Sequence, residues 1–91
     1  MKLTNSDKEI LKEYGYEDED FAQIQRALDK RNTKYTTYAD DEEPITREGV
    51  IKLLGRENFL SGLARSCFHY TAVRVVNGNV RVYFDSSNLF K

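Results

Sequence analysis

The segment from Thr46 to Asp85 carries two helix-forming patterns in succession and then two strand-forming patterns. The second helical pattern places six apolar residues at the spacing of one helical face, so they are expected to be buried together. They are Phe59, Leu60, Leu63, Ala64, Cys67 and Phe68. Two short helices joined by a tight turn and followed by a β-hairpin have the order of a winged helix-turn-helix. We therefore expect a small α+β domain, with N-terminal helices and a winged helix-turn-helix-like C-terminal half.

The opposite face of the second helix carries short polar groups around one long cation. These residues are Asn58, Ser61, Gly62, Arg65, Ser66 and His69. Such a composition suits close approach to a groove or to a partner surface. The sequence therefore predicts an exposed binding face on this helix.

The hairpin is predicted from Asn77-Gly78, which two β-branched runs flank and which accepts the positive φ values of a type I′ turn. The cross-strand pairs expected on the core side are Val75–Val80, Val73–Val82 and Thr71–Phe84. On the other side Arg74 would face Arg81. Two like charges directly opposite each other are destabilising unless solvent, an acidic neighbour or an anionic ligand compensates.

The N-terminal half is expected to be helical. Ser6 with Glu9 predicts a capping box at the start of a short first helix that ends at Gly15. A second helix should run from about Glu17 to Arg31, since acidic residues fill its first turn and basic residues its last. The acidic run thus has a structural explanation, helix initiation, beside a functional one.

Residues 33–38 are rich in strand formers and predict a third strand beside the hairpin. The charged run Asp40–Pro44 predicts a loop. Thr46 is a good N-cap for the next helix, which Gly55 ends. Its expected buried residues are Val50, Ile51, Leu53 and Leu54.

The length of 91 residues predicts one domain, with a boundary of charge but not of fold near residue 43. Residues 1–43 hold seven Lys/Arg against twelve Asp/Glu, a net charge of −5, and residues 44–91 hold seven against three, a net charge of +4. This asymmetry is typical of a basic binding face with an acidic back, of an acidic surface for a basic partner, or of two halves that attract each other.

Catalysis has little support in the sequence. Cys67 and His69 stand two apart in a helix, so their side chains would point to different faces and could not form a nucleophile–base pair. The single cysteine predicts a reduced, buried thiol of a cytoplasmic protein, and no apolar run predicts export or a membrane span. We expect no enzyme, no metal, no cofactor and no small-molecule substrate.

Nucleic acid and protein remain as alternative partners. For nucleic acid, the candidate contacts are Asn58, Ser61, Arg65, His69, Arg74 and Arg81. Tyr70 and Tyr83 beside the two hairpin arginines could stack single-stranded bases. For a protein partner, carboxylates could take the place of phosphates in a basic channel, and the candidates are Glu17, Asp18, Glu19, Asp20, Asp40, Asp41, Glu42 and Glu43.

The run from Pro44 to His69, with the later Val82 to Ser87, resembles small uncharacterised accessory proteins carried on phages and conjugative elements of Gram-positive bacteria. The resemblance includes no catalytic motif, so it implies a genomic setting and no residue role. Proteins from that setting include anti-CRISPR inhibitors and element-borne repressors.

We therefore expect a non-enzymatic protein that acts on nucleic-acid machinery in the cytoplasm of a bacterial host. The favoured case is an anti-CRISPR-type inhibitor that binds a Cas effector through its acidic residues. The alternative is a winged-helix DNA-binding transcriptional regulator.

Overall fold

Groups of helices are followed by pairs of strands in the part of the chain that the structure describes, residues 1–29, 34–38, 42–69 and 72–86 of a computed structural model. The elements are α1 (Asn5–Glu13), the 3₁₀ turn η1 (Asp18–Asp20), α2 (Phe21–Asp29), β1 (Lys34–Tyr38), β2 (Glu42–Pro44), α3 (Arg47–Leu54), α4 (Arg56–His69), β3 (Val73–Asn77) and β4 (Val80–Asp85). The strands form one antiparallel sheet in the order β2-β1-β4-β3. The predicted α+β class is confirmed.

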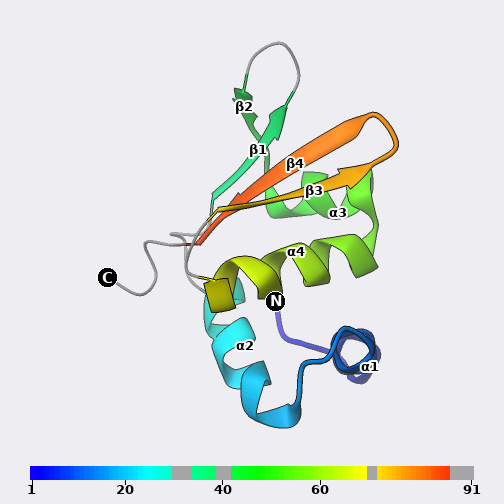
Figure 1. Ribbon diagram of the computed structural model, residues 1–91, viewed down its shortest axis with the longest axis vertical. Helices are drawn as coiled ribbons and strands as arrows, with labels where there is room; N and C mark the ends of the chain where they lie inside the picture. The colour runs from blue at the N-terminus through cyan, green and yellow to red at the C-terminus, as the bar shows by residue number, and fades with distance from the viewer. Residues whose placement is uncertain (30–33, 39–41, 70–71, 87–91) are drawn as a thin grey trace.

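Helix α4 lies at the centre, between the sheet with α3 on one side and α1 with α2 on the other (Figure 1). The predicted apolar face is confirmed, since all its members are fully buried except Phe68, which is partly buried against the core. The prediction of an exposed polar face is wrong for Ser61, Gly62 and Ser66, which are buried as well. With these three residues buried, α4 has no continuous polar face for a groove, although Glu57, Arg65 and His69 are exposed. A winged helix-turn-helix is not confirmed.

Gly62 explains how the sheet reaches α4 so closely. A Cβ atom at this position would stand 2.6 Å from Cγ2 of Val75 and 2.7 Å from Cε1 of Phe84. Both contacts are shorter than van der Waals packing allows. The glycine therefore makes room for the strand side chains, rather than for a ligand.

The β3–β4 hairpin is confirmed, but its predicted register is wrong by two residues. Asn77 pairs with Val80, so the two-residue turn is Gly78-Asn79, with Gly78 at φ +62°. The observed pairs are Val73–Phe84, Arg74–Tyr83, Val75–Val82 and Val76–Arg81. The valines keep their core side, but Arg74 and Arg81 are not directly opposite each other.

The side chain of Asn77 accounts for this register. Its amide donates to the carbonyl oxygens of Leu53 at 3.3 Å and Leu54 at 3.4 Å, at the end of α3. These carbonyls have no partner within the helix. Asn77 is therefore a strand residue whose side chain caps a helix. Turn rules based on neighbouring residues do not include such a contact.

Strand β1 pairs with β4 and confirms the predicted third strand. The loop expected at 40–44 is wrong for Glu42–Pro44, which pair with β1 as an edge strand. An edge strand tolerates proline because one side of it needs no backbone donor.

Helix ends follow local capping rules. Thr46 caps α3 as predicted, its hydroxyl oxygen accepting from the Gly49 N–H at 3.1 Å. The predicted capping box at Ser6 is wrong, because Thr4 caps α1 and Asp7 completes the box.

Two further predictions differ from the structure. Leu53, expected in the core, is 41% exposed. The predicted second helix is divided into η1 and α2, and its end at Arg31 lies outside the described residues.

Candidate functional site

The acidic run at η1 starts a helix and also faces solvent. The Asp20 carboxylate accepts from the Glu17 N–H at 2.9 Å, which supports the structural explanation for this run. Asp18 forms an exposed ion pair with Lys12 of α1 at 3.2 Å. The side chains of Glu17, Asp18 and Glu19 remain exposed.

Tyr14 connects this run to the central helix. Its ring is 46% exposed, and its hydroxyl donates to Oε1 of Glu57 in the first turn of α4 at 3.0 Å. This hydrogen bond to a carboxylate raises the pKa of Tyr14 above its usual value. An exposed aromatic ring is thus held in place by a residue 43 positions away.

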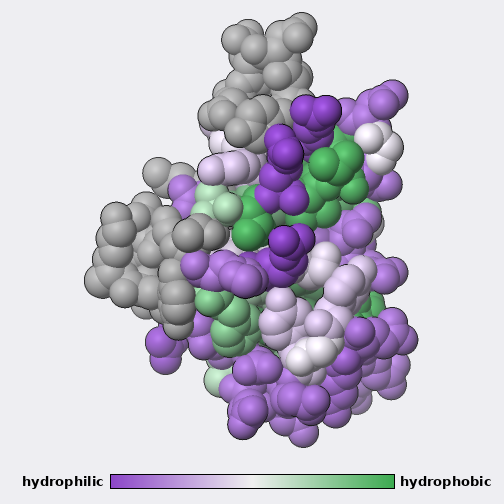
Figure 2. Space-filling model, viewed as in Figure 1, coloured by the Kyte–Doolittle hydropathy of each residue, from purple (hydrophilic) through white to green (hydrophobic). Residues whose placement is uncertain are grey.

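Tyr14 therefore joins the exposed carboxylates of α1 and η1, which lie close to it in the chain, to Glu57 of α4. We call this surface the acidic end and define it as Glu13, Tyr14, Glu17, Asp18, Glu19 and Glu57, all of them exposed. In Figure 2 hydrophilic residues cover the lower end of the molecule, where Figure 1 places α1 and the start of α2. Sequence reasoning found Glu17 to Asp20 but missed Tyr14 and Glu57, because only the α1–α4 contact brings them there.

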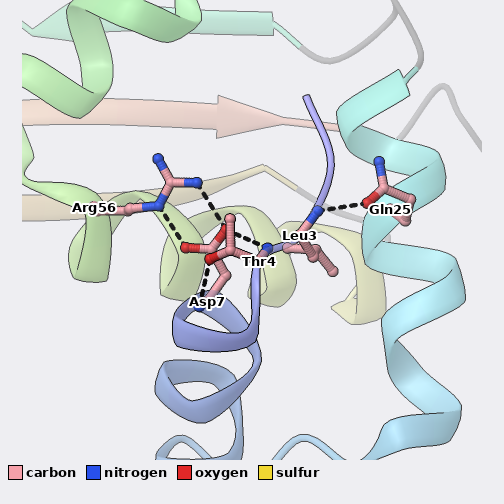
Figure 3. A network of polar contacts seen from close by, with 5 residues as sticks. All are labelled: Leu3, Thr4, Asp7, Gln25 and Arg56. Carbon is pink, nitrogen blue, oxygen red and sulfur yellow. Dashed lines mark hydrogen bonds and ion pairs between the residues drawn. The ribbon is translucent and has the colours of Figure 1, made fainter.

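A buried ion pair fixes α1 on α4 (Figure 3). Both oxygens of the fully buried Asp7 carboxylate accept from Arg56, with Nη2 at 2.7 Å from Oδ2. The Thr4 N–H also donates to Oδ2 at 2.9 Å. The hydrogen bonds from Arg56 hold the pKa of Asp7 below its usual value. This pair sets the position of Tyr14 and was not predicted, since nothing local marks Asp7 as buried.

Two arginines of the basic half are engaged inside the fold. Arg56 binds Asp7, and Nη2 of Arg47 donates to the Leu28 carbonyl at 2.7 Å. The remaining described cations of that half are Lys52, Arg65, Arg74 and Arg81, all exposed. The surface is therefore less basic than the sequence of residues 44–91 implies.

The structure does not bring the predicted nucleic-acid contacts onto one surface. The Asn58 amide donates to the Leu54 carbonyl at 3.0 Å, and Ser61 is only 8% exposed and donates to the Asn58 carbonyl at 3.1 Å. Arg65 and His69 are exposed on α4. Arg74 and Arg81 lie on the sheet face turned away from α4, because their strand neighbours Val75 and Val82 face it.

Some predicted residues are only partly covered by the structure. Asp40, Asp41 and Tyr70 lie outside the described residues, and Glu42 and Glu43 are described only by the backbone pairing of β2.

Cys67 has no exposed thiol that could act as a nucleophile. The thiol is fully buried, and burial raises its pKa to about 11, so it stays protonated at neutral pH. Within residues 1–29, 34–38, 42–69 and 72–86, no three His, Cys, Asp or Glu side chains converge as metal ligands. No helix in those ranges has the length and apolar character needed to cross a membrane.

A shallow hollow of about 320 Å³ lies between the N-terminal segment and α2. Its central polar group, Gln25, binds the Leu3 N–H at 2.8 Å, the Met1 carbonyl at 2.8 Å and the Asp29 carboxylate at 3.0 Å. The Gln25 amide therefore holds the N-terminal segment in place, and both of its polar atoms are already engaged.

Comparison of the chain with protein-family models, curated proteins and solved structures finds no match. The resemblance to accessory proteins of mobile elements stays a prediction.

Proposed function

We propose that this protein is a non-enzymatic binding protein whose acidic end docks on a basic protein surface. The observation that carries the proposal is the position of Tyr14, which is exposed, follows Glu13 of α1 and is hydrogen-bonded to Glu57 of α4, shortly before the acidic η1 in the chain. Tyrosine is enriched at the centres of interfaces, where its ring contributes contact area at a low cost in conformational entropy.

The chemistry of the acidic end favours arginine and lysine on the partner. Carboxylates form charge-assisted hydrogen bonds with guanidinium groups, and a tyrosine ring attracts cations over its face. Surfaces rich in such cations belong to proteins that bind nucleic-acid phosphates. The partner class we propose is therefore a nucleic-acid-handling protein, whose basic channel the acidic end would occupy.

The specific case we propose is an anti-CRISPR-type inhibitor of a Cas effector in a bacterial host. It combines the acidic end with the resemblance to mobile-element proteins. The alternative, a winged-helix regulator, would need α4 to present its polar face to DNA. Burial of Ser61, Gly62 and Ser66 argues against that role for α4.

The test uses single charge reversals of matched type. Glu19→Lys changes the acidic end, and Glu48→Lys makes the same change at an exposed first-turn position of α3, outside the acidic end. The measurement is Cas-mediated DNA cleavage with each variant present, at low and high salt. We expect Glu19→Lys, and more strongly the triple reversal of Glu17, Asp18 and Glu19, to reduce inhibition by slowing association, with a smaller effect above about 0.5 M salt.

Several results would contradict the proposal. Equal cleavage with wild type and with buffer across several Cas effectors would remove the specific case. Capture of partners from bacterial lysate that disappears after nuclease treatment would show that nucleic acid, rather than a protein, is bound. Equal loss of inhibition in Glu19→Lys and Glu48→Lys would move the binding surface away from the acidic end.

A further inference from the structure

The outer face of the sheet is the second surface that stands out. Helices α3 and α4 pack on the side of Val82 and Phe84, so the alternate residues of β3 and β4 face away from them. Arg74 and Arg81 are exposed there, Val76 is 52% exposed, and Tyr83 is half-buried. Asp85, half-buried, follows Tyr83 by two residues on the same face. The face thus combines two cations, one carboxylate, an aromatic ring and an aliphatic side chain.

The observed register arranges these groups around Tyr83. Arg74 is directly opposite Tyr83 on the neighbouring strand, and Arg81 precedes Tyr83 by two residues on the same strand. Directly opposite residues have Cβ atoms about 5 Å apart, and diagonal neighbours about 7–8 Å apart. The two arginines are such diagonal neighbours and flank the ring.

Neither arginine is engaged elsewhere in the part of the protein that the structure describes. No hydrogen bond or ion pair there involves the guanidinium of Arg74 or Arg81. Arg47 and Arg56 differ, because the fold itself binds their guanidinium groups. Arg74 and Arg81 are therefore available for an anionic ligand.

We propose that this sheet face binds single-stranded nucleic acid, independently of the acidic end. A base would stack on Tyr83 while Arg74 and Arg81 contact the phosphates on either side of it. Stacking on one aromatic residue contributes about 1–3 kcal/mol per base, which lessens the need for many phosphate contacts. The charge of the two unengaged guanidinium groups complements the phosphates of this occupant.

A duplex fits this face less well. Its bases are already stacked on one another, and reading them requires an element that enters a groove. The helix that a winged helix-turn-helix would place in a groove is α4, and most of its residues are buried against the sheet and the other helices. Duplex binding would also need more phosphate contacts than two arginines supply.

The experiment measures fluorescence anisotropy of labelled oligonucleotides of about ten nucleotides with the full chain. The probes are oligo-dU, oligo-rU and a duplex of matching length. We expect a single-strand Kd tighter than about 10⁻⁴ M at low salt, and a slope of log K against log salt near −1.4, at about −0.7 for each of two phosphate contacts.

Three variants separate the two parts of the site. Arg74→Ala with Arg81→Ala should remove most of the salt slope. Tyr83→Leu should weaken binding about 5- to 150-fold without changing the slope, and Tyr83→Phe should restore it. Arg65→Ala removes an equally exposed arginine on α4 and should change nothing.

Three outcomes would overturn the proposal. The first is single-strand binding no tighter than about 10⁻⁴ M at low salt, the level of non-specific association. The second is duplex binding equal to or tighter than single-strand binding. The third is an equal loss of affinity in Arg65→Ala. Circular dichroism of each variant shows whether the fold survives. A preference between oligo-dU and oligo-rU, which share one base, would identify the sugar that the site accepts.

Discussion

Asp7 shows how far the role of one residue can lie from its local sequence. It stands in a short polar helix, yet it is fully buried and receives hydrogen bonds from Thr4 and Arg56. A buried carboxylate is tolerated only when its hydrogen-bonding capacity is satisfied. Two donors from α4 and one from the N-cap meet that condition, so this residue couples helix capping to helix packing.

Replacing Asp7 should destabilise the fold and change its response to acid. We expect Asp7→Ala to cost about 2–4 kcal/mol, through loss of the cap and of charge-assisted hydrogen bonds. The pKa of Asp7 is lowered on folding, so its stabilisation is present at neutral pH. That stabilisation is lost as the pH falls below the unfolded value of 3.8 and through the lower folded value.

Urea unfolding at neutral pH and near pH 3 measures both effects. Asp7→Asn should lose less stability on acidification than wild type, because it has no carboxylate to protonate. Asp18→Asn is the control, since its ion pair with Lys12 is exposed. Identical acid sensitivity in wild type and Asp7→Asn would show that the buried pair does not drive the pH dependence.

Gly62 gives a second test at the scale of one residue. Alanine is the better helix former by about 1 kcal/mol, so Gly62→Ala would stabilise an isolated α4. In the folded protein its Cβ would meet Val75 and Phe84 at less than 3 Å. We expect a net loss of about 1–3 kcal/mol from overpacking. A thermal midpoint at or above that of wild type would mean that the sheet does not approach α4 this closely.

Among the secondary-structure elements, a feature could be predicted from the sequence when the interactions that cause it are local. Thr46 caps α3, and the apolar face of α4 is buried, because capping and periodicity act within a few residues. The register of β3 and β4 could not be predicted from Asn77-Gly78, since the end of α3 draws Asn77 into the strand. Ser61 looked like a contact residue because short polar side chains fit both a groove and a tight helix–sheet contact.

The hairpin register can be tested through Val76. In the observed register this exposed residue is directly opposite Arg81, whereas a turn at Asn77-Gly78 would place it opposite Asn79. We expect Val76→Glu to be more stable than Val76→Lys by about 0.5–1.5 kcal/mol, from attraction in one variant and repulsion in the other. The difference should largely disappear when Arg81→Ala is added. A stability difference that Arg81→Ala leaves unchanged would instead support the register with its turn at Asn77-Gly78.

At the scale of the whole molecule, an aromatic cluster joins the helices to the sheet. The ring of Phe59 in α4 lies 6.1 Å from that of Tyr35 in β1 and 6.1 Å from that of Phe84 in β4. Tyr35 and Phe84 meet edge to face at 5.4 Å. The burial of Tyr35 raises its pKa to about 12, so it stays neutral in this cluster. The stability of the domain therefore depends on Phe59 at the junction of its layers.

Phe59→Ala should cost about 3–5 kcal/mol, a large part of the total stability of about 5–15 kcal/mol expected for a domain. We expect a single cooperative transition at a much lower temperature, or loss of near-ultraviolet circular dichroism already at ambient temperature. Leu53→Ala removes a side chain that is 41% exposed and should change the midpoint little. Similar midpoints for the two variants would contradict the central position of Phe59.

The inner strand pair also sets the order in which the chain folds. Lys34 pairs with Asp85 and Tyr38 with Arg81, so β1 must wait for a segment more than forty residues away while the helices form locally. Docking of the β3–β4 hairpin onto β1 should therefore limit the refolding rate. We expect Val82→Ala to slow refolding in stopped-flow experiments, and Leu11→Ala in α1 to act mainly by speeding unfolding. Until the hairpin docks, the backbone N–H and C=O groups on one edge of β1 are unpaired and open to other chains, so dilute refolding should give the higher yield of native protein.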